Sequence, residues 1–296
     1  NSGTLTLAGV NSFSGGTTLW GGTLEVNGDA SLGALPAAPS TNLRFAAGST
    51  LRAVANHALA ANRTLAIGAN VAATFDPQGF TQTVCGVISG GAGSGLVKTG
   101  AGTAALDPGT DRTNSVWSLS AKAGTLHFLS GTHLVTSNTV WNQYKVYDIL
   151  HVNGGTLLVG GGLLMTTGDG YATVQNGSLM VTNGTVNLCS LRELLNAYAG
   201  TGNTTVSGSG VLDLNVLRIT QSGTPHDQNV VNVNTGGTIR LNNFNIDTGQ
   251  YAPYGTVNLN GGTLVVKIPT GGFLGYNTPK WLTNVFVRVL EGGAVI

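Results

Sequence analysis

The chain has 296 residues, of which 8% are charged and 6% are aromatic, and its formal net charge is +1. The few charges are scattered and form no basic stripe, which argues against nucleic-acid binding and against a basic membrane-binding helix. No apolar run approaches the roughly 20 residues of a membrane-spanning helix, so membrane insertion is not expected. The 41% hydrophobic residues stand in short alternating runs, which predict a buried core.

A short phrase, Gly-Thr-Leu-x-hydrophobic, returns along the whole chain. A small turn followed by a short alternating strand, copied many times, is typical of a solenoid. In the copy GGTLEV, Leu24 and Val26 are expected to point inward and Thr23 and Glu25 outward, with a corner glycine in front. The phrase predicts strands at 2–7, 21–26, 123–128, 154–159, 176–181, 183–188, 236–241, 254–259, 261–266 and 292–296.

The spacing of the turn glycines gives the length of one coil. Gly3 and Gly22, like Gly155 and Gly177, are separated by roughly 20 residues, which is within the range of solenoid repeats. The intervals from Gly177 to Gly184 and from Gly255 to Gly262 are too short for a coil and predict consecutive strands around a corner. We therefore expect an all-β fold: one parallel β-helix over 1–296, with irregular coils of about 18–31 residues.

Four segments depart from the repeat, and we expect loops or a helix there. Ser190 to Glu193 has the spacing of a helix-capping box, and leucines follow at helical intervals, which predicts one short flanking helix over 191–199. The decorations are expected at 106–150, 190–200, 220–230 and 269–281.

Two stretches carry a more specific motif. The block Gly-x-Gly-Leu-x-Lys-x-Gly-x-Gly-Thr stands at 93–103, and Gly-Thr-Leu-Thr-Leu stands at 3–7, followed by SGGTT at 14–18 and GTL at 22–24. Together they resemble the autotransporter-associated β-strand repeat of bacterial surface proteins. The resemblance implies a right-handed parallel β-helix exposed outside a bacterial cell. It implies no particular activity.

The chain begins and stops inside a copy of its repeat, which predicts an open coil edge at each end. Bare edges invite another strand. We expect them to join further repeats of a longer polypeptide or neighbouring copies stacked head to tail in a filament. The expected self-association residues are Thr4, Leu5, Leu7, Val289, Leu290, Val295 and Ile296.

Motifs that carry chemistry are scarce. No nucleophile or phosphate-binding motif occurs, and His127, His133 and His151, in no standard zinc spacing, are expected at the surface or at sheet edges. Cys85 and Cys189 are expected to be buried free thiols, since several coils separate them. If carboxylates gather anywhere, the spacing favours a stack of Asp148, Asp169 and Asp213. We assign no catalytic, cofactor-binding or metal-binding residue, and expect no cofactor.

These observations predict a structural, extracellular β-solenoid at the bacterial cell surface, either a rigid stalk or a self-assembled filament, and not an enzyme. A first alternative is an adhesin that binds surface glycans. A second alternative is a polysaccharide-degrading β-helix enzyme. The adhesin would use an aromatic ligand loop of Trp117, Trp141, Tyr144 and Tyr147.

Overall fold

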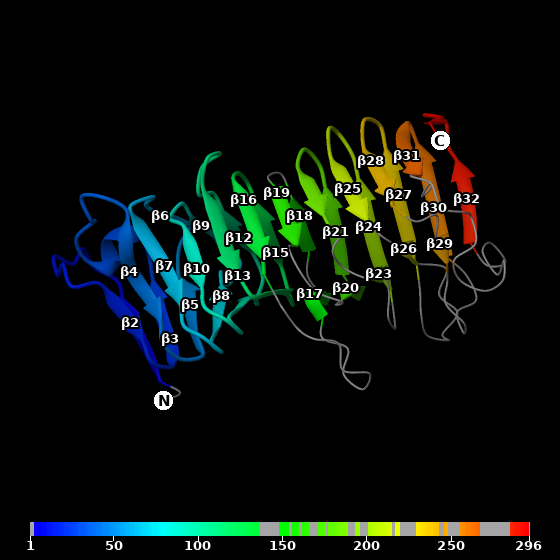
Figure 1. Cartoon of the computed structure of the whole chain (residues 1–296). Coiled ribbons are helices and arrows are strands. Elements are labelled where there is room, and N and C mark those ends of the chain that lie inside the picture. The colour runs from blue at the N-terminus through cyan, green and yellow to red at the C-terminus, as the bar shows by residue number, and fades with distance from the viewer. Residues whose placement is uncertain are drawn as a thin grey trace. The chain divides into compact units, whose positions relative to one another are not determined.

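Short parallel strands wind around three faces, as the repeated phrase predicts. The computed structural model divides into two units, residues 1–137 and 138–296, and each is described by itself. In each unit, every pair of strands in the described residues is parallel, and Figure 1 shows them side by side. The described residues are 3–136, 148–153, 156–159, 162–165, 171–175, 177–188, 193–195, 201–214, 217–219, 229–242, 246–247, 255–266 and 285–295.

In the first unit the chain visits sheet A, then sheet C, then sheet B in each full coil. Sheet A contains β1 (Thr4–Leu7), β3 (Gly22–Val26), β5 (Ser49–Ala53), β8 (Ala72–Asp76), β11 (Gly95–Lys98) and β14 (Ser118–Ala121). Sheet B contains β2 (Thr17–Leu19), β4 (Ser40–Phe45), β7 (Arg63–Ile67), β10 (Ile88–Gly90), β13 (Thr113–Val116) and β16 (Thr132–Val135). Sheet C contains β6 (His57–Leu59), β9 (Thr81–Val84), β12 (Thr103–Leu106) and β15 (Thr125–Phe128).

The second unit repeats this arrangement. Sheet A contains β17 (Asp148–Asn153), β20 (Tyr171–Gln175), β23 (Glu193–Leu195), β26 (Leu217–Arg218) and β29 (Ile246–Asp247). Sheet B contains β19 (Gly162–Met165), β22 (Thr185–Asn187), β25 (Val211–Leu214), β28 (Thr238–Leu241), β31 (Gly262–Val266) and β33 (Ala294–Val295). Sheet C contains β18 (Thr156–Val159), β21 (Gly177–Val181), β24 (Gly202–Val206), β27 (Val230–Asn234), β30 (Gly255–Asn260) and β32 (Val285–Val289).

The strand register gives the number of residues in each coil. In the first unit Thr4 lies beside Thr23, whereas in the second unit Thr263 lies beside Val295, which is a much longer step along the chain. The irregular coil length predicted from the glycines is therefore confirmed. The short glycine intervals are also explained, because β21 and β22 follow each other on different sheets, and so do β30 and β31.

The core is built from columns of inward side chains. Leu24, Leu51 and Phe75 occupy one column of sheet A, and the rings of Phe75 and Phe45 meet edge to face with centroids 6.0 Å apart. All of these side chains are buried. Alternate residues of each strand face inward, so each coil adds a layer of apolar contacts to the next.

Two local predictions were wrong. Residues 193–195 are not helical; they form β23, which pairs with β20 on one side and β26 on the other, and Leu194 is buried. Backbone pairing with two neighbouring coils outweighs a local helical pattern here. The loop predicted over 106–150 is also partly wrong, because Thr113–Val116, Ser118–Ala121, Thr125–Phe128 and Thr132–Val135 are strands.

The other decorations at 220–230 and 269–281 lie largely outside the described residues. Cys189 also lies outside them. Cys85 is a free thiol as expected, but it is half-buried and not fully buried. The single domain over 1–296 stays a prediction, since the two units are described separately.

We expect the core columns to dominate stability. Replacing Phe75 with Ala in the first unit should lower the free energy of unfolding by about 3–5 kcal/mol, since it removes a fully buried ring. The matched control is Thr74→Ala on the same strand, where the side chain points outward and the loss should stay within about 0.5 kcal/mol. Chemical denaturation measures both. Equal losses at the two positions would contradict the inward assignment of Phe75.

Candidate functional site

The N-terminal end of the first unit presents two sheet edges. β1 is the first described strand of sheet A and β2 the first of sheet B. Leu5 begins the same inward column as Leu24, yet Leu5 is 59% exposed and Leu24 only 2%. Thr4 is exposed and Leu7 is half-buried. The predicted self-association residues of this end therefore lie on an accessible edge.

Within the described residues, sheet C has no strand in the first two coils. In the second coil its place is taken by a 3-10 helix, η1 (Asp29–Leu32), and in the first coil by residues 8–16. Asn11 binds η1 through its backbone N–H, which donates to the Ala30 carbonyl at 3.0 Å, and through Nδ2, which donates to the Ser31 carbonyl at 2.7 Å. The Ala34 N–H donates to the Phe13 carbonyl at 2.9 Å.

A tight approach holds these two layers together. Gly33 has a φ of 84°, and a Cβ there would lie 2.2 Å from the Phe13 carbonyl oxygen. Only glycine fits this position without strain. Residues 8–16 therefore lie directly on residues 29–34, which we call the η1 segment, and are not a free loop.

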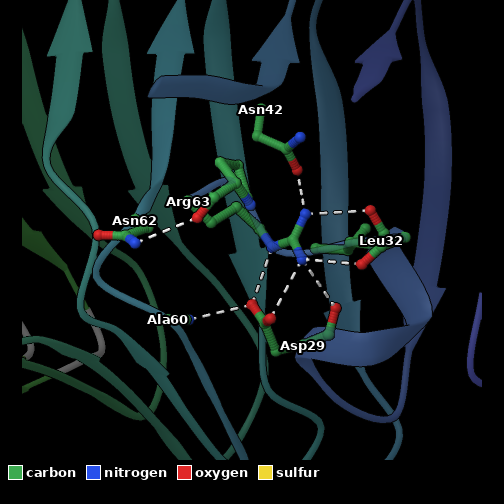
Figure 2. A network of polar contacts seen from close by, with 8 residues as sticks. Asp29, Leu32, Asn42, Ala60, Asn62 and Arg63 are labelled. Atoms are coloured by element: carbon green, nitrogen blue, oxygen red, sulfur yellow. Dashed lines mark hydrogen bonds and ion pairs between the residues drawn. The ribbon is translucent and has the colours of Figure 1, made fainter. Parts of the chain in front are cut away.

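Arg63, the first residue of β7, binds the η1 segment from the following coil (Figure 2). Its guanidinium has no exposed surface. Nε donates to Asp29 Oδ1 at 2.8 Å and Nη2 donates to Asp29 Oδ2 at 3.1 Å. Nη1 and Nη2 also donate to the carbonyls of Leu32 and Gly33, at 3.0 and 3.1 Å, and Nη1 donates to Asn42 Oδ1. We call these contacts the Arg63–Asp29 lock.

The lock also covers the edge of sheet C. The Ala60 N–H, directly after β6, donates to Asp29 Oδ1 at 3.0 Å. Burial alone would raise the pKa of Asp29, but the hydrogen bonds from Arg63 and Ala60 outweigh it and hold this pKa below its usual value. Asp29 is therefore a carboxylate in the folded chain, and its charge is matched by Arg63.

Outward side chains of sheet A form a second polar ladder. Thr6 donates to Glu25 at 2.7 Å, Arg52 Nη1 lies 3.3 Å from Glu25, and Arg52 Nε lies 2.9 Å from Asp76. These four residues occupy one column across β1, β3, β5 and β8. Alternating partners directly opposite each other favour this register over a slipped one.

Residues 1–26 match the model of the passenger-associated-transport-repeat family. This confirms, for β1, β2 and β3, the resemblance to the passenger repeats of autotransporters that the sequence predicts. No curated protein and no solved structure matches the chain. A passenger repeat implies a secreted or cell-surface protein, and the β-solenoid fold fits a surface passenger domain. None of the described residues forms an apolar helix long enough to cross a membrane.

Lys98, the lysine of the repeat block at 93–103, has a structural role. Lys98 enters the inward column of sheet A beside Phe75 and is fully buried. Its ammonium donates to the carbonyls of Thr99 and Gly100, both at 2.8 Å, and to Ala123 of the next coil at 3.0 Å. Burial lowers the pKa of Lys98 to about 8, although Asp76 opposes this. The Lys-x-Gly motif thus ties one corner to the next.

His133 is not a surface or edge histidine. It is 3% exposed, and its ring stacks on Phe128 with centroids 4.1 Å apart. Nε2 donates to the Ser130 carbonyl at 3.0 Å, and Nδ1 then accepts from Asn114 Nδ2 at 3.1 Å. Burial lowers the pKa of His133 to about 4, although the hydrogen bond to the Ser130 carbonyl opposes this shift. The residue is a neutral part of the core, whereas His127 is half-buried.

The C-terminal end of the second unit also exposes apolar residues. Val289 closes β32, Leu290 follows it, and Val295 belongs to β33. All three are exposed, with 60% of the Val289 surface accessible. Ile296 lies outside the described residues. As at the N-terminal end, the predicted residues that are described lie on or beside strands at the end of their sheets.

The predicted aromatic ligand loop is only partly described. Trp117 is half-buried and forms a one-residue corner between β13 and β14, with its N–H 3.2 Å from Ser94 Oγ. Trp141, Tyr144 and Tyr147 lie outside the described residues. Trp20, which the sequence prediction of a ligand loop did not include, stands at the same kind of corner between β2 and β3 and is 73% exposed. Its position directly before Gly21-Gly22 was the available signal.

The carboxylate stack is not formed as predicted. Asp148 lies on sheet A and Asp213 on sheet B, so the two do not share a column, and Asp169 lies outside the described residues. Asp213 is instead 3.6 Å from Arg240 on the neighbouring strand. Within the described residues, no group of three histidines, cysteines or carboxylates is placed to hold a metal ion.

We expect the Arg63–Asp29 lock to carry more stability than the exposed ladder. Arg63→Met leaves the partly buried Asp29 carboxylate and the Leu32 and Gly33 carbonyls without their Arg63 donors, and should cost about 3–5 kcal/mol of unfolding free energy. Arg52→Met is the matched control: it breaks ion pairs to Glu25 and Asp76, but the Arg52 side chain is partly exposed, and the change should cost a small fraction of that. Chemical denaturation compares them. Comparable losses of unfolding free energy would show that the burial of Arg63 adds no stability.

The buried His133 predicts acid sensitivity. Its pKa is about 4 when folded and near 6.5 when unfolded, so below pH 6.5 the unfolded chain binds the proton more readily. The His133 contribution is complete above pH 6.5 and declines as the pH falls toward 4. Unfolding free energies at several pH values measure this slope. His133→Gln should flatten the slope in this window, and an unchanged slope would assign it to other groups.

Proposed function

We propose that this chain is a section of a rigid stalk on the outside of a bacterial cell, with a mechanical and not a catalytic role. The observation that carries the proposal is the stacking of successive coils by parallel strand pairing in the described residues of each unit. β3, for example, pairs over its length with β1 on one side and β5 on the other. A passenger repeat at residues 1–26 supports the surface location.

Three kinds of contact oppose bending or sliding of one coil on the next. Backbone hydrogen bonds join successive strands, apolar columns fill the interior, and outward ladders such as Thr6, Glu25, Arg52 and Asp76 discourage slippage. In the second unit an amide ladder does the same, since Asn258 donates to Asn232 at 2.9 Å and Asn232 donates to Asn203 at 3.3 Å. Such a stack transmits load without needing a ligand.

Surface display tests the stalk. The chain is placed between a membrane anchor and a fluorescent tag on a bacterium, and the height of the tag above the membrane is measured by super-resolution imaging. A rigid section gives a narrow height distribution, whereas a Gly/Ser linker of equal residue number gives a broad one because it is a flexible coil. A distribution as broad as that of the linker would end the proposal.

Adhesion is a second candidate, favoured by the exposed indole of Trp20. Trp20 and Trp117 stand at equivalent sheet B to sheet A corners, and aromatic faces stack on sugars through their apolar surface. Glycan-array binding that Trp20→Ala abolishes would support it. The control is Leu129→Ala, at an exposed leucine on another corner, which should leave binding unchanged. No binding by the unmodified chain would remove this candidate.

End-to-end assembly is the other form of the structural proposal. Its support is the exposure of apolar side chains at both ends, Leu5 at one and Val289 and Val295 at the other. Sedimentation over a range of protein concentrations distinguishes a filament from a stalk section, because only the filament grows with concentration.

A further inference from the structure

The N-terminal end offers a new coil two strand edges and not three. The outer edges of β1 and β2 continue sheets A and B. On the third side the first described strand of sheet C is β6, and the η1 segment lies over its edge, fixed by the Arg63–Asp29 lock and by the Ala60 N–H. Residues 8–16 lie over η1 in turn. The edge of sheet C is therefore covered twice.

The first coil shows what kind of coil this end receives. Residues 4–7 pair with 23–26 on sheet A, and residues 17–19 pair with 43–45 on sheet B. On the third side it contributes no strand, only a loop: Asn11 donates two hydrogen bonds to the η1 segment, and the Phe13 carbonyl accepts one from it. The interface between the first two coils thus combines two strand pairings with one loop-on-loop contact.

We propose that the N-terminal end is a selective acceptor for a coil built like residues 3–21, with strands on sheets A and B and a loop on the third side. The inference rests on the proposed stalk function and names the partner of its end surface. It continues an interface already present in the molecule, since β1 offers the new coil the same Gly-Thr-Leu edge that β3 offers β1.

The exposed apolar residues fit this partner. Leu24 is 2% exposed because the first coil covers it, whereas Leu5, in the same column, is 59% exposed. A further coil would cover Leu5 in the same way. On the third side Val10 and Phe13 are exposed, and a loop can lie over them without needing backbone partners in a fixed register.

A coil with a strand on the third side fits poorly. Where β6 meets a coil without a strand on this side, Asp29 accepts from the Ala60 N–H and is held by Arg63. Residues 8–16 contain neither a strand nor a charged residue, so they provide no such partner for the N–H and C=O groups of a new strand. The C-terminal end of a second copy is of this kind, since β32 belongs to sheet C. The geometry therefore favours a repeat coil over the opposite end of another copy.

Two extensions of the full chain test the selection. One fuses a second copy of residues 3–21 directly before Gly3. The other fuses residues 95–117, which carry β11, β12 and β13 and so include a strand for sheet C. Hydrogen exchange is then measured at the native residues 4–7 and 17–19. We expect the first extension to slow exchange there at least tenfold, and the second to leave it within twofold of the unextended chain.

Each other outcome overturns the inference. Equal protection by both extensions would mean that the end does not select, and no protection by either would mean that it accepts no coil. Concentration-dependent protection of residues 4–7, 17–19 and 285–289 in the unextended chain would identify the C-terminal end of a second copy as the occupant. None of these results touches the stalk function, which the height of the displayed tag tests separately.

Discussion

Parallel pairing between successive coils is the constraint on which this structure depends. Once Thr23 lies between Thr4 and Thr50, Leu24 must lie between Leu5 and Leu51, and Glu25 beside Arg52. A single register thus sets the apolar interior, the outward ladders and the corners together. A slip by one residue would exchange the inner and outer faces of a strand, so the buried leucines hold the register that the backbone forms.

The charged side chains of the Arg63–Asp29 lock, of the outward ladder on sheet A and of Lys98 lie where strand pairing stops or where neighbouring coils must be aligned. Arg63 and Asp29 occupy the side on which sheet C ends, where backbone groups have no neighbouring strand. Lys98 satisfies three carbonyls at a corner, two in its own coil and one in the next. Buried charges of this kind are tolerated only when they are well hydrogen-bonded, and both are. These charges have structural roles.

A passenger repeat in a solenoid suits a surface protein that must be stable without a ligand. Each coil contacts only its neighbours, so length can change without a new core. The exposed features, Trp20 and the end strands, then become the places where binding would be added. The stalk and adhesin proposals differ only in whether those places have partners.

The sequence by itself determined the strands that carry the repeated phrase, their corners and the irregular coil length, because alternation and glycine turns are local signals that a few neighbouring residues carry. It did not pick out the strands between those copies, such as β4, β7 and β10. It failed at residues 193–195, where a helical pattern yielded to pairing with β20 and β26, and at His133, which the sequence could not place in the core. Only the tertiary structure decided which residues meet across coils. Arg63 and Asp29 are far apart in the sequence, and coil steps as unequal as Thr4 to Thr23 and Thr263 to Val295 leave no fixed period that would align them in advance.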